Sequence, residues 1–167
     1  MSIVSVPPGS SRFDYAGLAP KAFAAYMAFG ESLAGSSIEA PLCDLVTTRA
    51  SQINGCAFCV DMHVKEATIH GERALRLHHL AVWHESNLFS KRERAALAWT
   101  EVLTRRGDGQ GVDAVFEEIQ GHLSEQEIAD LTFLVMLING WNIANLAVRN
   151  APGSMDAVLG LDAATLG

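Results

Sequence analysis

A chain of 167 residues with 49% hydrophobic residues is long enough to bury one sizeable core, and its formal charge of −7 disfavours nucleic acid as a partner. The apolar run Phe133 to Ile138, like every other uninterrupted apolar run in the sequence, is far shorter than the roughly 20 residues that span a bilayer, so we expect no membrane partner. The N-terminus lacks the basic and apolar regions of a secretory signal, and we therefore expect a cytoplasmic protein.

The first part of the chain predicts an arm followed by two helices. Residues 1–17 are rich in proline, glycine and serine and are expected to form an N-terminal arm, ahead of a helical domain over residues 18–150. Apolar residues recur at helical spacing from about residue 20 until a Gly-Ser-Ser turn. Ser37 is then the expected N-cap of a second helix, which runs to about Asn54.

The rest of the chain continues the helical pattern. One helix is expected from Cys56 to about Gly71, and another over residues 72–83. Two capping boxes, Ser90 to Glu93 and Ser124 to Glu127, each predict the start of a helix.

The helix after Ser124 is apolar on more than one face, which predicts burial inside the monomer or against a partner subunit. It ends before Pro152-Gly153, and residues 151–167 form a tail with a last helical turn or two. No alternating strand pattern is present, so the predicted fold is a single-domain, all-α helical bundle.

Two cysteines and a histidine form the reactive cluster of the sequence. Cys56, Cys59 and His63 fall on one face of a helix, and Gly55 just before them marks the start of that helix. A thiol at this end of a helix is favoured as the thiolate by the helix dipole. Because residues three apart on a helix are neighbours, we expect oxidation to close a Cys56–Cys59 disulfide and to leave Cys43 as a free, inert buried thiol.

Other uses of the cluster are less consistent with its spacing. A zinc site needs a fourth ligand, for which only Cys43 or His70 is available. Haem attachment requires a histidine directly after the second cysteine, and a thioredoxin domain requires a preceding strand where this chain predicts a helix. Two inert core thiols beside a hydrogen-bonded histidine remain possible.

Three stretches carry a resemblance to a known family. Asp44 to His63, with the motif Arg-Ala-Ser-Gln-Ile-Asn-Gly-Cys-Ala-Phe-Cys-Val-Asp-Met-His at its heart, resembles the core of the AhpD-like alkylhydroperoxidases of the carboxymuconolactone decarboxylase superfamily. The similarity extends to residues 93–102 and 138–142, so it covers about residues 20–150. The resemblance implies an oligomer, a trimer or hexamer, whose thiol pair reduces hydrogen peroxide or small organic hydroperoxides without haem, metal or other cofactor. A cellular dithiol would then reduce the oxidised pair.

The resemblance also implies roles for four residues. Cys59 would attack the peroxide and Cys56 would resolve the sulfenic acid, although the helix dipole favours ionising Cys56; His63, one turn from Cys59, would take the thiol proton. Asp44 stands where the family has a glutamate and would act as the relay carboxylate, through His63 or a water. Phe58 stands where the best-known AhpD proteins have a histidine.

Two alternative functions keep the same fold. The cysteine pair would serve equally in a redox-sensing or disulfide-exchanging oligomer that responds to oxidant without turnover. A carboxymuconolactone decarboxylase-type lyase is less consistent with the sequence, because that chemistry leaves the thiol pair unexplained.

Overall fold

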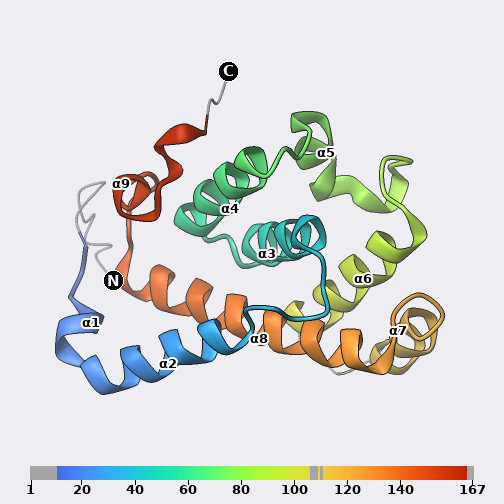
Figure 1. Cartoon of the computed structure of the whole chain (residues 1–167), viewed down its shortest axis with the longest axis horizontal. Coiled ribbons are helices and arrows are strands. Elements are labelled where there is room, and N and C mark those ends of the chain that lie inside the picture. The colour runs from blue at the N-terminus through green and yellow to red at the C-terminus, as the bar shows by residue number, and fades with distance from the viewer. Residues whose placement is uncertain (1–10, 106–108, 110, 165–167) are drawn as a thin grey trace, which may run out of the picture.

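The computed structural model describes residues 11–105, 109 and 111–164, and these residues form helices without a strand (Figure 1). The predicted all-α fold is therefore confirmed. In chain order the elements are α1 (Tyr15–Leu18), α2 (Pro20–Ser32), α3 (Ala40–Asn54), α4 (Ala57–Ile69), α5 (Ala74–His79), the 3₁₀ helix η1 (Leu80–Glu85), α6 (Lys91–Arg105), α7 (Val112–Ile119), α8 (Glu125–Val148), α9 (Asp156–Leu159) and the 3₁₀ helix η2 (Leu161–Ala163).

Helix α3 lies at the centre of the molecule, where it contacts α4, α6 and α8. Its fully buried residues Leu42 and Val46 belong to the main hydrophobic cluster, which α6, α7 and α8 complete. Leu45 points into a second cluster with Leu80, Trp83, Phe89 and Leu97. The central helix is thus packed on several sides, so residues at its C-terminal end have fixed positions.

A buried ion pair ties α3 to α6. Two guanidinium nitrogens of Arg49, Nε and Nη2, lie 2.8 and 2.7 Å from Oε1 of Glu101, and the indole N–H of Trp83 donates to the same oxygen at 2.7 Å. Burial by itself would raise the pKa of Glu101, but the bonds from Trp83 and Arg49 hold it below its usual value. The charge of Arg49 is therefore compensated inside the core.

The two predicted capping boxes are present. At the start of α8, Glu127 N–H donates to Ser124 Oγ and Ser124 N–H donates to the Glu127 carboxylate. Ser90 and Glu93 exchange the same two bonds before α6. Short-range pairing of this kind is specified by sequence spacing alone.

Two local predictions are wrong. Ser37 does not cap α3, whose N-cap is Glu39. Instead, the N–H and the hydroxyl of Ser37 donate to Asp130 of α8, at 2.8 and 2.7 Å. The helix expected over residues 72–83 is divided: α5 ends at His79, and the 3₁₀ helix η1 follows, with non-helical backbone angles at Val82 inside it. In the first case a carboxylate from a distant helix competes successfully for a local capping residue.

Helix α8 is buried on one side only. Exposed apolar side chains on its outer side include Met136 and Ile143, with exposed fractions of 54% and 59%. Length and composition alone would allow α8 to cross a membrane. However, its inner side carries the buried Asn139, Asn142 and Asn145, and it packs on α3 and α6 as the core helix of a bundle does.

Both ends of the described chain fold back on the bundle. Of the expected arm, residues 1–10 lie outside the described part. The N–H and the guanidinium of Arg12 donate hydrogen bonds to the carbonyl oxygens of residues 146–148, at the C-terminal end of α8. In the tail, Asp156 accepts a 2.7 Å bond from Lys65 of α4, and Leu161 is buried. The tail therefore packs on the cysteine helix; residues 165–167 lie outside the described part.

Candidate active site

The turn between α3 and α4 positions both cysteines. Gly55 adopts a left-handed conformation, φ 68°, which ends α3 at little cost for a residue without a side chain. The chain then turns back, and Cys56 becomes the N-cap of α4. The thiol pair therefore sits at the positive end of a 13-residue helix, as the sequence predicted.

Cys56 and Cys59 are joined in a disulfide, with their Cα atoms 5.3 Å apart. Cys56 Sγ also accepts a hydrogen bond from the backbone N–H of Cys59 at 3.3 Å, so the sulfur serves as the helix cap. The two residues are 2% and 0% exposed and pack with Phe58 and Met62. The predicted pairing is confirmed, and the apolar cover restricts access to the sulfur atoms.

Cys43 is a free thiol, as predicted, but it is half-buried rather than fully buried. Burial, with a smaller effect of the neighbouring Asp44 carboxylate, raises the pKa of Cys43 to about 11. The thiolate needed for redox chemistry is accordingly disfavoured at this position.

His63 lies one turn beyond Cys59, and its side chain is hydrogen-bonded to Glu66. Its Nδ1 is 2.7 Å from Oε2 of Glu66, and its Nε2 is buried without a hydrogen-bond partner among the described residues. Because an ionised carboxylate only accepts, Nδ1 is the nitrogen that carries the proton when the imidazole is neutral, and Nε2 then holds the lone pair. Sequence reasoning did not single out Glu66, although its three-residue spacing from His63 on a helix was the available signal.

Asp44 is near this pair but bonded elsewhere. Its Oδ2 lies 2.8 Å from Nδ1 of His70, whose side chain is half exposed, and no direct hydrogen bond joins Asp44 to His63. Burial raises the pKa of Asp44, with a further rise from the Glu66 charge, while His70 and His63 act in the opposite direction. All four side chains thus interact electrostatically.

A network of asparagines fixes the loop that carries the cysteines. The side-chain amide of Asn54 donates to Asn139 Oδ1 at 2.9 Å and to Asn142 Oδ1 at 2.7 Å, and Asn142 donates to Ser51 Oγ at 3.0 Å. These bonds attach the last turn of α3 to the middle of α8. The position of Cys56, two residues after Asn54, follows from that attachment.

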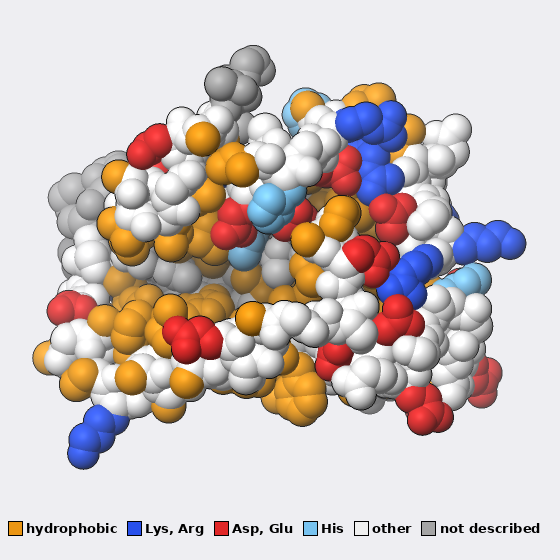
Figure 2. All heavy atoms as spheres, viewed as in Figure 1, with side chains coloured by type: hydrophobic (Ala, Val, Ile, Leu, Met, Phe, Trp, Pro, Cys, Tyr) orange, Lys and Arg blue, Asp and Glu red, His pale blue; other side chains and the backbone are white. Residues whose placement is uncertain are grey.

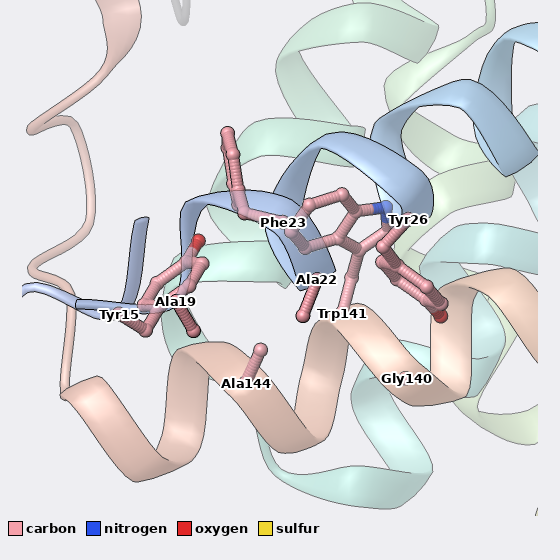
Figure 3. A pocket seen from close by; sticks show the side chains of 8 residues that line it. All are labelled: Tyr15, Ala19, Ala22, Phe23, Tyr26, Gly140, Trp141 and Ala144. Carbon is pink, nitrogen blue, oxygen red and sulfur yellow. The ribbon is translucent and has the colours of Figure 1, made fainter. Parts of the chain in front are cut away.

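A separate apolar groove lies between α1, α2 and α8 (Figure 3). It has a volume of about 320 Å³, and its walls include Phe23, Tyr26 and Trp141. Tyr26 donates its hydroxyl to Leu137 O at 2.7 Å, and a Cβ on Gly140 would collide with that hydroxyl. Figure 2 shows hydrophobic side chains gathered on this side of the molecule, around a hollow, and most of the Lys and Arg side chains in view toward the opposite end.

Among the described residues, no three His, Cys, Asp or Glu side chains are arranged to hold a metal ion. The reactive groups of the site are the cysteine pair and the His63–Glu66 and Asp44–His70 pairs.

Comparison with known proteins identifies the family. The model of the carboxymuconolactone decarboxylase family matches residues 20–102. The uncharacterized protein YdfG of Bacillus subtilis is 33% identical over 145 residues, which cover 87% of this chain and 99% of YdfG. The chain belongs to the carboxymuconolactone decarboxylase family.

Solved structures place it in the AhpD-like branch. A protein of unknown function from Agrobacterium tumefaciens, described as a putative antioxidant defence protein AhpD, shares 37% identity and superposes with a TM-score of 0.81, covering 86% of this chain and 98% of that one. The debrominase Bmp8 shares the fold, at 18% identity and a TM-score of 0.74, covering 87% of this chain and 78% of that one. The resemblance expected from the sequence motifs is confirmed, and family and fold are both related to enzymes.

Proposed function

We propose that the protein is a thiol-dependent peroxidase that reduces hydrogen peroxide or small organic hydroperoxides. The observation that carries the proposal is a closed disulfide at the N-terminus of α4, one turn before a histidine whose Nε2 is buried and unpartnered. A pair that closes within one helical turn can cycle between dithiol and disulfide without rearranging the fold.

The proposed cycle uses four residues. In the reduced protein, His63 Nε2 takes the proton of Cys59, and the Cys59 thiolate attacks one peroxide oxygen. The S–O bond forms as the O–O bond breaks, and the proton returns to the leaving alkoxide or hydroxide. Cys56 then attacks the sulfenic acid sulfur, the disulfide forms and water leaves. Asp44 stays the proposed relay carboxylate, and it acts on His63 through space rather than by a direct bond.

The partners of this cycle follow from its chemistry. Two electrons must return to the disulfide for each peroxide reduced, so we propose a cytoplasmic dithiol as the reductant. Because the sulfur atoms are covered by Phe58 and Met62, small peroxides are the favoured substrates.

Peroxide consumption tests the proposal. Reduced protein with excess dithiol should consume hydrogen peroxide or a small alkyl hydroperoxide over many turnovers, and the Cys59→Ser variant should not. Cys43→Ser is the matched control, since Cys43 lies outside the disulfide and its thiolate is disfavoured. Equal rates in the wild type and in Cys59→Ser would refute the peroxidase.

The burial of both sulfur atoms also favours a second candidate, a redox sensor or disulfide-exchange protein whose cysteine pair is oxidised by peroxide without catalytic turnover. Such a protein would form the disulfide stoichiometrically with peroxide, yet show no sustained consumption with any dithiol. The same assay therefore separates the two functions.

We also propose a homo-oligomer, a trimer or hexamer, in which the outer side of α8 is covered. Met136, Ile143 and Leu146 are 54%, 59% and 44% exposed at helical spacing, and such an apolar stripe is uncommon on a free surface. Light scattering should give a multiple of 17.9 kDa, and Ile143→Glu should dissociate the assembly. Val158→Glu, an exposed apolar site on α9, is the control; a wild-type monomer would contradict the proposal.

A further inference from the structure

We propose that Glu66 is the positioning residue for His63, and that it, rather than Asp44, sets which nitrogen of the imidazole faces the thiol pair. The inference rests on the proposed peroxidase chemistry for its role, but its structural content concerns the histidine alone. It starts from a contact that pairs an acidic side chain with His63 within a single helix, 2.7 Å from Oε2 to Nδ1.

The geometry determines the tautomer. Glu66 is three residues beyond His63, so both side chains lie on the same face of α4. An ionised carboxylate has no hydrogen to donate, which requires that Nδ1 of His63 be protonated. In the neutral imidazole the other nitrogen, Nε2, then holds a lone pair. A base of this kind is ready to accept a proton without first losing one.

The burial of His63 makes that arrangement chemically meaningful. The His63 side chain is only 11% exposed, and its Nε2 has no protein partner within the described residues. Leaving a buried polar atom without a hydrogen-bond partner costs free energy, so we infer that Nε2 gains a partner during the reaction. A thiol proton from Cys59, one turn away, is such a group in the reduced protein.

Asp44 occupies a different place in the same cluster. From α3, its carboxylate is bonded to His70 at 2.8 Å, and the His70 side chain is 50% exposed. The titratable groups of this cluster besides His63 are Glu66 on the same helix, His70 at the C-cap of that helix and Asp44 on α3. Only Glu66 makes direct contact, so the two carboxylates have different tasks.

The charge balance supports this division. When Nε2 takes the thiol proton, the ring becomes an imidazolium that holds a proton on each nitrogen. The Glu66 carboxylate already on Nδ1–H compensates the new positive charge in a buried site, where such a bond is stronger than in water. When the proton passes to the leaving oxygen of the peroxide, the ring returns to the same tautomer. No other donor or acceptor has to move.

Nitrogen NMR of the full-length protein in its disulfide form, labelled with ¹⁵N-histidine, tests the inference without any peroxide. In this form Cys59 has no thiol proton to give, and the spectra are recorded at a pH at which the imidazole is neutral. The His63 signals are assigned by their loss in His63→Asn. We expect wild-type Nδ1 to be protonated and Nε2 to be the unprotonated nitrogen. In Glu66→Gln, whose amide can donate as well as accept, the proton should shift partly or wholly to Nε2. Asp44→Asn should leave the His63 tautomer unchanged.

The kinetic arm asks whether the tautomer matters. Glu66→Gln should slow the oxidation of Cys59 by peroxide about 10²-fold, the lower end of the range for general-base catalysis. The exposed Glu117→Gln on α7 is the matched control for the same chemical change. Because Glu66 is 36% exposed, the variant should fold, which circular dichroism checks.

Each result bears on the proposal. Protonated Nε2 in the wild type, an unchanged tautomer in Glu66→Gln, or a shifted tautomer in Asp44→Asn would overturn it. A shifted tautomer with an unchanged oxidation rate would overturn the positioning role. If the wild type consumes no peroxide, the proposed function fails, whereas the NMR result still decides how His63 is held.

Discussion

Reduction of the Cys56–Cys59 disulfide should weaken the fold only slightly. The bond closes a loop of four residues, since the two cysteines are three apart in sequence. Loop-closure entropy for so short a loop amounts to about 2 kcal/mol of unfolding free energy at 25 °C. For a chain of this length that corresponds to a fall in melting temperature of roughly 4–8 °C. The helix cap itself should survive, because a thiol sulfur also accepts a hydrogen bond.

Urea unfolding followed by circular dichroism, with and without a strong dithiol, measures the difference. The Cys56→Ser/Cys59→Ser variant is the control, because dithiol should not change its stability. Cys56→Ser alone should be at least as stable as the reduced wild type, since serine is a preferred N-cap. Loss of more than about 4 kcal/mol, or unfolding on reduction, would show that the bond is structural and would refute the reasoning that it can cycle.

Three further predictions concern charges and the remaining thiol. Asp44→Asn should slow formation of the Cys59 sulfenic acid near neutral pH, by up to about 10²-fold, while Asp44→Glu, which keeps the charge, should retain most of the rate. Stopped-flow oxidation measures both variants. An Asn variant as fast as the wild type would show that Asp44 has no part in the relay. Cys43 in the folded protein should be alkylated at pH 8 about 10²-fold more slowly than an ordinary thiol, because its pKa is raised to about 11; mass mapping that found rapid labelling would contradict the effect of burial. Hydrogen bonds from Arg92 and then from the capping serine lower the pKa of Glu127 to about 2, from 4.5. Since the folded pKa of Glu127 is below the unfolded one, this stabilisation is present above pH 4.5 and is lost as the pH falls toward 2. Glu127→Gln should therefore flatten the pH dependence of the free energy of unfolding in urea within that window. An unchanged slope would refute the assignment.

Local spacing in the sequence determines much of the secondary structure, and the cysteine pairing, of this protein. The start of α4 at Cys56, the disulfide three residues along and the Ser124–Glu127 capping box depend on atoms within one helical turn. Such contacts follow from helix geometry and need no knowledge of the rest of the chain. The all-α class followed in the same way from periodicity.

The partners of the acidic side chains depended on packing between distant helices. Asp44 bonds to His70, and Ser37 to Asp130, because the angles at which α3 meets α4 and α8 bring these groups together. Sequence pattern does not contain those angles. The contact of Asn54 of α3 with Asn139 and Asn142 of α8 is likewise a product of tertiary packing, and it fixes the cysteine loop.

The His63–Glu66 contact lies between these two cases. Its spacing was visible in the sequence, but many acid–histidine pairs at that spacing are solvated and contribute little. Only the tertiary structure buried His63, left its Nε2 without a partner and directed Asp44 to another histidine. The sequence thus determined which groups can meet along one helix. The packing of α3 against α4 decided which of these groups is removed from water, and burial matters because a hydrogen bond is electrostatically stronger in the protein interior than in water.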